Sequence, residues 1–178
     1  MTFTRAFVVA VMLTFSGVST AAEDPYNLGV GAWRKKDYAE AVHQWSLAAL
    51  SGEVNALNNL GYLYDNGMGV AQDHGAAVKL WLLAAHSGQS ESQWHLGIAY
   101  EQGTGVPKDL VVAYAWFGCA VDNAKRLAPD DSSGTESNIA ADAQESLAAV
   151  SSKLDKSELE RAEHLRTMLV QRYGIAAP

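Results

Sequence analysis

Residues 56–88, ALNNLGYLYDNGMGVAQDHGAAVKLWLLAAHSG, decide the fold, because much of this segment recurs 36 residues further along the chain. A period between about 20 and 50 residues is typical of stacked helical repeats. The sequence therefore predicts units that are completed by packing against their neighbours. The identical pairs are Leu60 and Leu96, Gly61 and Gly97, Tyr64 and Tyr100, Gly67 and Gly103, Gly69 and Gly105, Val70 and Val106, and Asp73 and Asp109.

Each unit is predicted to hold two helices joined by a glycine-rich loop. Leu60 and Leu63 belong to an apolar stripe with helical spacing, which predicts an amphipathic first helix. Gly67 follows it where a left-handed terminating residue is needed. Asp73 is suited to cap the second helix, because its carboxylate accepts backbone N–H groups and favours the helix dipole. Trp81 and several alanines then form the predicted buried stripe of that helix.

The pattern L-G-x-x-Y-x-x-G-x-G-V-x-x-D-x-x-x-A resembles the Sel-one-like repeat family, relatives of the tetratricopeptide repeats. The resemblance implies an all-α fold, a right-handed α-solenoid of antiparallel helix pairs. It also implies a scaffold or adaptor for other proteins, often in bacterial envelopes, and it carries over no catalytic residue. We therefore expect four stacked helix pairs, the last one divergent, in a protein that is not an enzyme and needs no cofactor.

The chain is predicted to divide into six segments. They are a signal peptide at 1–22, a tetratricopeptide-like helix pair at 23–52, Sel-one-like repeats at 53–88 and 89–128, an acidic polar loop at 129–137, and a capping helix pair at 138–178. The first pair has a tighter turn, since Leu28 precedes Asp37 by 9 positions whereas Leu60 precedes Asp73 by 13. Atypical terminal units are what capping of a solenoid requires.

The first 22 residues have the pattern of an export signal: Arg5, an apolar run and then small residues. Cleavage after Ala21 or after Ala22 fits equally, and an uncleaved N-terminal anchor is the alternative. We expect a periplasmic (Gram-negative) or secreted protein with no membrane insertion after cleavage.

With Cys119 as its one cysteine, the chain forms no internal disulfide. A buried apolar role for Cys119 is expected, with a redox or intermolecular role as the alternative.

Charge narrows the class of partner. Without residues 1–22 the chain carries 12 basic and 20 acidic residues, a net charge of −8. Nucleic acids and anionic membranes require clustered lysine and arginine, so neither is expected as a partner. The predicted partner is a protein or peptide of the cell envelope, and the chain is expected to be a monomer.

No catalytic motif is found: the chain has no G-x-S-x-G, H-E-x-x-H, phosphate-binding loop or S-x-x-K. The five histidines form no i, i+3 or i, i+4 pair. His86 and His95 could approach each other across a turn, but structural metal sites usually need four ligands. No metal site is therefore predicted.

A binding surface is predicted on the first helices, which in solenoids of this type line the concave face. The residues there, off the structural stripe, are Asn55, Asn58, Asn59, Tyr62, Glu91, Trp94, His95 and Ile98. Trp94 replaces Asn58 of the preceding repeat and is not required by the packing of its own repeat. It is either an exposed interface anchor or packed under a neighbouring helix, for instance near the N-terminal unit.

Two closing helices are predicted at 138–154 and 157–173, the second with a Ser157/Glu160 capping box. They serve as a cap, or as a partner-binding helix in the alternative interpretation.

The leading functional hypothesis is a scaffold that binds a protein or peptide on its concave face. The second is an envelope enzyme or binding protein for cell-wall fragments, using Trp94, His95 and the acidic loop. A third is a regulatory partner of a membrane sensor or secretion assembly.

Overall fold

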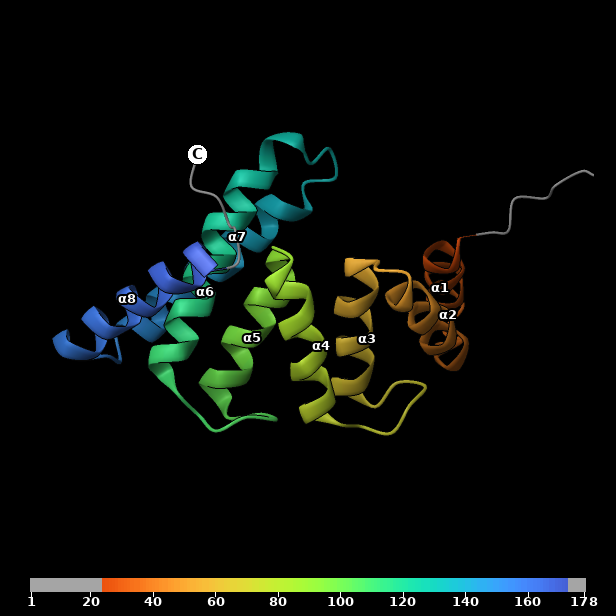
Figure 1. Cartoon of the computed structure of the whole chain (residues 1–178), viewed down its shortest axis with the longest axis horizontal. Coiled ribbons are helices and arrows are strands. Elements are labelled where there is room, and N and C mark those ends of the chain that lie inside the picture. The colour runs from red at the N-terminus through yellow and green to blue at the C-terminus, as the bar shows by residue number, and fades with distance from the viewer. Residues whose placement is uncertain (1–23, 173–178) are drawn as a thin grey trace, which may run out of the picture.

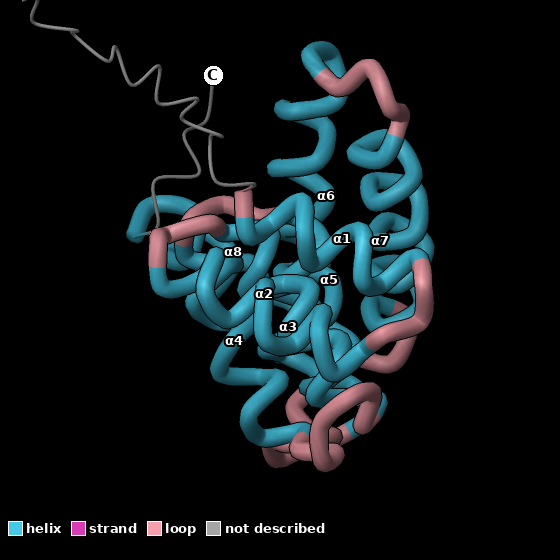
Figure 2. Tube along the Cα trace, turned by 90° about the vertical axis from the view of Figure 1, so that its right-hand side faces the viewer, coloured by secondary structure: helices cyan, strands magenta, loops and turns pink. Residues whose placement is uncertain are grey.

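The fold consists of helices that pack in pairs and follow one another in an arc (Figures 1 and 2). The computed structural model describes residues 24–172, and this range contains no strand. The predicted all-α architecture of helix pairs is confirmed, while the expected signal peptide lies outside the described residues. The helices are α1 (Pro25–Arg34), α2 (Tyr38–Leu50), α3 (Val54–Asn66), α4 (His74–His86), α5 (Ser90–Gln102), α6 (Leu110–Leu127), α7 (Thr135–Ser151) and α8 (Lys156–Arg172), with a 3-10 turn at Ala128–Asp130.

Helix ends lie where glycine and aspartate predicted them. Gly67 ends α3 with a φ of 65°, and Gly103 ends α5 with a φ of 79°. Both are in the left-handed region, where a Cβ atom is unfavourable. The Asp73 carboxylate accepts the Ala76 amide at 2.9 Å, and the Asp37 carboxylate accepts the Glu40 amide at 3.2 Å. The loop and cap assignments are therefore confirmed.

An aromatic ring from the second helix of each repeat lies directly against a glycine of the first helix. Trp81 lies on Gly61 so closely that a Cβ atom added to the glycine would overlap the indole. Phe117 lies on Gly97 in the same way. The ring is buried in both cases, since Trp81 is 4% exposed and Phe117 is 0% exposed. The absent side chain thus fixes how closely the two helices approach.

The C-terminal helices depart from the repeat. Both α7 and α8 pack on α6, with Leu147, Val150 and Ala162 buried against its apolar face. Arg166 of α8 makes a bidentate pair with Asp122 of α6, with distances of 2.6 Å from Nη2 to both carboxylate oxygens. No helix in the range 24–172 is long and apolar enough to cross a membrane.

Two details at the C-terminal end differ from the sequence-based expectation. Helix α7 begins at Thr135, three residues before the predicted start. The Ser157/Glu160 capping box is wrong, because Asp155 and Glu158 make it instead. The Asp155 carboxylate accepts the Glu158 amide at 2.8 Å, and Glu158 accepts the Asp155 amide at 3.0 Å. Asp155 is as good a cap as serine and comes first, so the cap lies two residues earlier than predicted and α8 begins at Lys156.

Cys119 is fully buried in the core around Trp81 and Trp116. Burial raises the pKa of its thiol to about 12, with the nearby Arg166 opposing the shift. Since the thiolate is the nucleophile and the metal ligand, a buried thiol with a raised pKa is unsuited to either role at neutral pH. The expected role as a small apolar residue is confirmed.

Gly61→Ala should destabilise the protein by about 1–3 kcal/mol, because the methyl group must displace the Trp81 ring in a packed core. Gly31→Ala is the matched control: it also lies within a helix, but a Cβ atom there meets nothing within 4 Å. This control should gain up to about 1 kcal/mol, since alanine is the better helix former. Urea-induced unfolding measures both. Equal effects of the two substitutions would contradict the glycine–ring contact.

Candidate binding site on the face of the first helices

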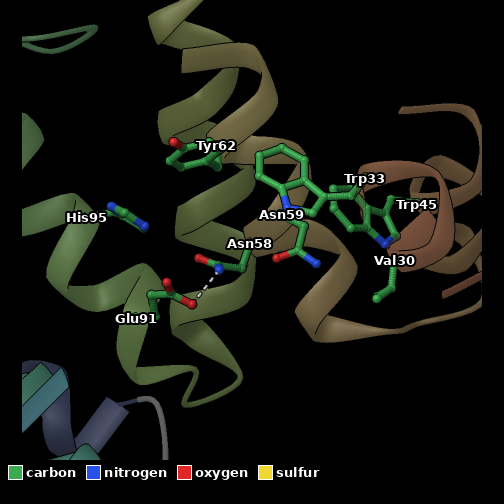
Figure 3. A pocket seen from close by; sticks show the side chains of 8 residues that line it. All are labelled: Val30, Trp33, Trp45, Asn58, Asn59, Tyr62, Glu91 and His95. Carbon is green, nitrogen blue, oxygen red and sulfur yellow. Dashed lines mark hydrogen bonds between the residues drawn. The ribbon is translucent and has the colours of Figure 1, made fainter. Parts of the chain in front are cut away.

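A pocket of about 290 Å³ opens on the face formed by α1, α3 and α5 (Figure 3). We call it the aromatic pocket. Trp45 of α2 also contributes its ring to the lining. The lining residues come from three consecutive repeats. The lining residues are Val30, Trp33, Trp45, Asn58, Asn59, Tyr62, Glu91 and His95.

One wall of the aromatic pocket is a cluster of three rings. The centroid of Trp33 lies 5.9 Å from that of Trp45 and 5.7 Å from that of Tyr62, the latter in an edge-to-face arrangement. Trp45 is fixed from behind, since its indole N–H donates to the Tyr26 carbonyl oxygen at 3.2 Å. Tyr62 keeps 40% of its surface exposed. Rings that are held in place and partly open to solvent are typical of interface anchors.

The opposite wall is polar and joins α3 to α5. The Asn58 amide donates to Glu91 Oε2 at 2.8 Å, and Ser92 Oγ donates to Asn58 Oδ1 at 2.8 Å. Asn58 is only 4% exposed, so its predicted place on a free face of α3 is corrected: α5 covers it. Both ends of its amide are satisfied, and Asn58 therefore positions Glu91.

Glu91 carries a partly buried carboxylate. Burial raises its pKa above the ordinary value, the hydrogen bonds from Asn58 and Gln89 oppose this, and the nearby Glu136 carboxylate adds to it. None of the residues that line the aromatic pocket is a lysine or arginine. The side chains that donate hydrogen bonds to Glu91, the amides of Asn58 and Gln89, are neutral. A carboxylate kept from water without a cationic partner is costly to ionise.

His95 lies beside Glu91 as a neutral ring. Its imidazole stacks on Trp81 at a centroid distance of 4.7 Å and contacts Trp94 at 5.3 Å. Burial lowers the pKa of His95 to about 4, and the Asp65 carboxylate opposes that shift only in part. At neutral pH His95 therefore adds an aromatic, uncharged edge to the pocket.

A second, more polar pocket of about 390 Å³ adjoins the first, and we call it the acidic pocket. It shares Asn58, Asn59 and Glu91 with the aromatic pocket. Its other lining residues are Tyr26, Asn55, Gln89, Asp131, Ser133, Thr135, Glu136 and Ile139. The predicted acidic loop thus faces the first helices, although the structure leaves a shorter connection because α7 begins at Thr135.

The acidic residues of this pocket are held by hydrogen bonds. Ser90 Oγ donates to Glu136 Oε2 at 2.5 Å, and Asp131 Oδ2 accepts the Glu136 amide at 2.8 Å. Hydrogen bonds from the Ser133 side chain and from backbone amides lower the pKa of Asp131. Asp131 is therefore a fixed negative charge at the start of α7.

The structure brings together most of the predicted site residues, and two lie elsewhere. Asn58, Asn59, Tyr62, Glu91 and His95 line the aromatic pocket, and Asn55 lines the acidic pocket. Trp94 and Ile98 instead pack on the core shared by α6, α7 and α8. The Trp94 indole N–H donates to Ser146 Oγ of α7 at 3.3 Å. Trp94 is thus packed under a neighbouring helix, at the C-terminal side and not near the N-terminal unit.

Sequence reasoning missed Val30, Trp33 and Trp45. A signal for Val30 was present, because it precedes Tyr62 by 32 residues, the same interval that separates Leu28 from Leu60. If the first unit is aligned with the second by this interval of 32 residues, Val30 falls at the position equivalent to Tyr62 and therefore on the same face. Trp33 has no such signal, since the equivalent positions hold Asp65 and Glu101.

The chemistry available is recognition by shape, ring faces and amide groups. Within residues 24–172 no group of three or more histidine, cysteine, aspartate or glutamate side chains is arranged to hold a metal ion. His95 and Glu91 are the titratable groups of the aromatic pocket besides Tyr62. None of these has an alcohol or thiol nucleophile beside it in that lining.

The chain is an α-helical repeat protein. Its helices pack in pairs that follow one another in an arc, and the first helices of successive pairs together form the pocket. The sequence matches the Sel1 repeat over residues 22–53, 54–89 and 90–124, more than half of the chain. The protein therefore belongs to the Sel1 repeat family. No curated protein matches the sequence.

The solved structures that are similar to this chain include two bacterial repeat proteins. One is c5321, a protective antigen of uropathogenic Escherichia coli strains with an SLR fold, at 30% identity and a TM-score of 0.71, covering 84% of this chain and 30% of that one. The other is a Sel1 repeat protein from Oxalobacter formigenes, at 25% identity and a TM-score of 0.55, covering 85% and 69%. This chain thus spans less than a third of the length of c5321.

Acid should destabilise the protein through His95. Its pKa of about 4 in the folded state is below the ordinary 6.5, so the unfolded chain binds more protons between these values. The free energy of unfolding should therefore decrease as the pH falls from about 6.5 to about 4. Urea-induced unfolding of wild type and His95→Gln at pH 7 and pH 4.5 isolates the effect, and the variant should lose less. An NMR titration of His95 with a midpoint near 6.5 would contradict the burial argument.

Proposed function

We propose that this Sel1 repeat protein is a non-catalytic scaffold of the cell envelope that binds a protein or peptide on the concave face formed by α1, α3 and α5. The observation that carries the proposal is the aromatic pocket, where rings and amides from three repeats converge. Extended concave surfaces are the usual binding surfaces of stacked repeats. Localisation in the periplasm or outside the cell, through residues 1–22, is part of this proposal.

The two adjoining pockets suit an extended peptide. The aromatic pocket offers ring surface for one side chain, and Tyr62 remains exposed enough to be covered by a partner. The acidic pocket offers the side-chain amides of Asn55 and Asn59. Amides both donate and accept hydrogen bonds, so they match the N–H and C=O groups of a peptide backbone. Ordered rings and amides keep the entropic cost of binding low.

Tyr62→Ala should abolish partner capture while changing the free energy of unfolding by less than about 1 kcal/mol, because the ring is 40% exposed. The measurement is crosslinking in intact cells followed by pull-down of C-terminally tagged protein. Leu50→Ala is the control, since Leu50 is 86% exposed and lies outside both pockets.

One envelope protein recovered by wild type and Leu50→Ala, and lost by Tyr62→Ala, would support the proposal. Equal recovery by all three would refute the pocket as the site. Cell-wall fragments recovered in place of a protein would favour the second hypothesis, a binding protein or enzyme for such fragments.

Trp94→Ala should behave in the opposite way to Tyr62→Ala. Trp94 packs on the core of α6, α7 and α8, so its removal leaves a cavity and should cost about 2 kcal/mol or more. Urea-induced unfolding measures this cost. A negligible change in stability together with lost capture would instead make Trp94 an exposed anchor.

A further inference from the structure

We propose that the aromatic pocket receives an arginine side chain of the partner peptide, held between the rings of Trp33 and Tyr62 and the carboxylate of Glu91. This inference rests on the proposed function, because the arginine belongs to the peptide that lies on the concave face. It adds the chemical identity of the central recognised group.

The rings provide the first argument. Trp33, Trp45 and Tyr62 form one wall, with Trp33 at its centre. The face of an aromatic ring is negative, and a cation within about 6 Å of the ring centroid is attracted to it. A guanidinium is planar and weakly hydrated, so it stacks on such rings better than an ammonium does.

The wall opposite the rings provides a negative charge that can pair with the guanidinium. Glu91 faces the rings across the pocket (Figure 3), and Asn58 holds it in place by a hydrogen bond of 2.8 Å. Burial and the Glu136 carboxylate both raise the pKa of Glu91, although the Asn58 and Gln89 hydrogen bonds oppose this, and no lysine or arginine lines the pocket beside it. A guanidinium that enters the pocket would compensate the Glu91 charge through charge-assisted hydrogen bonds.

The surroundings are electrostatically suited to a cation. Lysine and arginine are absent from the residues that line the aromatic and acidic pockets. His95 is neutral because burial lowers its pKa to about 4, so it does not repel a positive guest. Asp131 and Glu136 of the adjoining pocket add negative charge. The chain without residues 1–22 has a net charge of −8, which favours the approach of a basic segment.

A peptide suits this surface better than a free small cation. The acidic pocket continues from the aromatic one through Asn58, Asn59 and Glu91. Its amide groups have no role for an isolated guanidinium, but they match a peptide backbone on either side of the arginine. The carboxylates of Asp131 and Glu136 would accept a second basic residue nearby.

Glu91→Gln is the decisive variant, because it should have opposite effects on stability and binding. Glutamine can still accept the Asn58 amide, and the partly buried charge is gone. Since the pKa of Glu91 is raised in the folded state, its ionisation weakens folding as the pH rises above the ordinary value of 4.5. The variant should therefore melt at a higher temperature than wild type at pH 7, and this difference should vanish near pH 4.

Binding is measured by isothermal titration calorimetry with acetyl-Ala-Ala-Arg-Ala-Ala-amide at low salt and pH 7. Wild type should bind this peptide, and Glu91→Gln should bind it at least 10-fold more weakly, which is about 1.4 kcal/mol. The control is Glu145→Gln, which removes the same charge from an exposed position of α7 outside both pockets. It should leave the affinity within about 2-fold, as expected for screened surface charges.

Three probes separate the sources of recognition. A peptide with citrulline in place of arginine keeps the shape without the charge and should bind at least 10-fold more weakly, and a lysine peptide should fall in between. N-acetyl-arginine-amide should bind more weakly than the pentapeptide. Equal affinity for citrulline and arginine would overturn cation recognition and leave peptide binding intact. Equal affinity for the single residue and the pentapeptide would overturn the peptide as the source.

The proposed function and this inference fail in distinguishable ways. If the intact-cell pull-down recovers a Tyr62-dependent partner while none of the charged peptides binds, the scaffold proposal stands and the arginine proposal is wrong.

Lowering the pH to 4 should abolish arginine binding in wild type. Glu91 then loses its charge and His95 begins to gain one, while Asp131 keeps its own because its pKa is lowered. Undiminished binding at pH 4 would contradict the role of Glu91.

Discussion

The contact between a glycine on one helix and a ring on the next is the interaction on which the rest of the structure depends. It occurs three times in register, at Gly29 with Trp45, Gly61 with Trp81 and Gly97 with Phe117. Because the glycine has no Cβ atom, each ring lies close against the backbone of its partner helix. This spacing lets small alanines fill the remaining interface, among them the fully buried Ala77 and Ala84 of α4 and Ala113 and Ala120 of α6.

The same contact places the candidate site. Trp45, Trp81 and Phe117 fill the space between the two helices of each pair. The other face of α1, α3 and α5 is therefore left for polar and aromatic residues. Trp45 serves both purposes, since it lies on Gly29 and is also part of the aromatic wall of the pocket. The stacking of repeats then aligns equivalent positions, so that Tyr62 of one repeat faces Glu91 and His95 of the next. The site is therefore a property of neighbouring repeats and not of any single one.

Periodic features could be predicted from the sequence, whereas features between repeats could not. Gly67, Asp73 and Leu60 act within one unit, and the 36-residue period fixes their roles. Asn58 was misplaced because its partners, Glu91 and Ser92, lie in the next repeat. Trp94 depends on α7, which follows no repeat, so its burial on that helix has no periodic signal.

Burial opposes the ionisation of Glu91, and the proposed arginine recognition would explain why a carboxylate stands at this position. Most positions of the fold satisfy cap, packing and hydrogen-bond preferences together. Glu91 instead holds a carboxylate in a partly buried place where burial and Glu136 both oppose its ionisation. Glutamine at this position would keep the bond to Asn58 without the charge. Natural proteins accept such local costs where binding requires them, and a guanidinium entering the pocket would relieve this one directly.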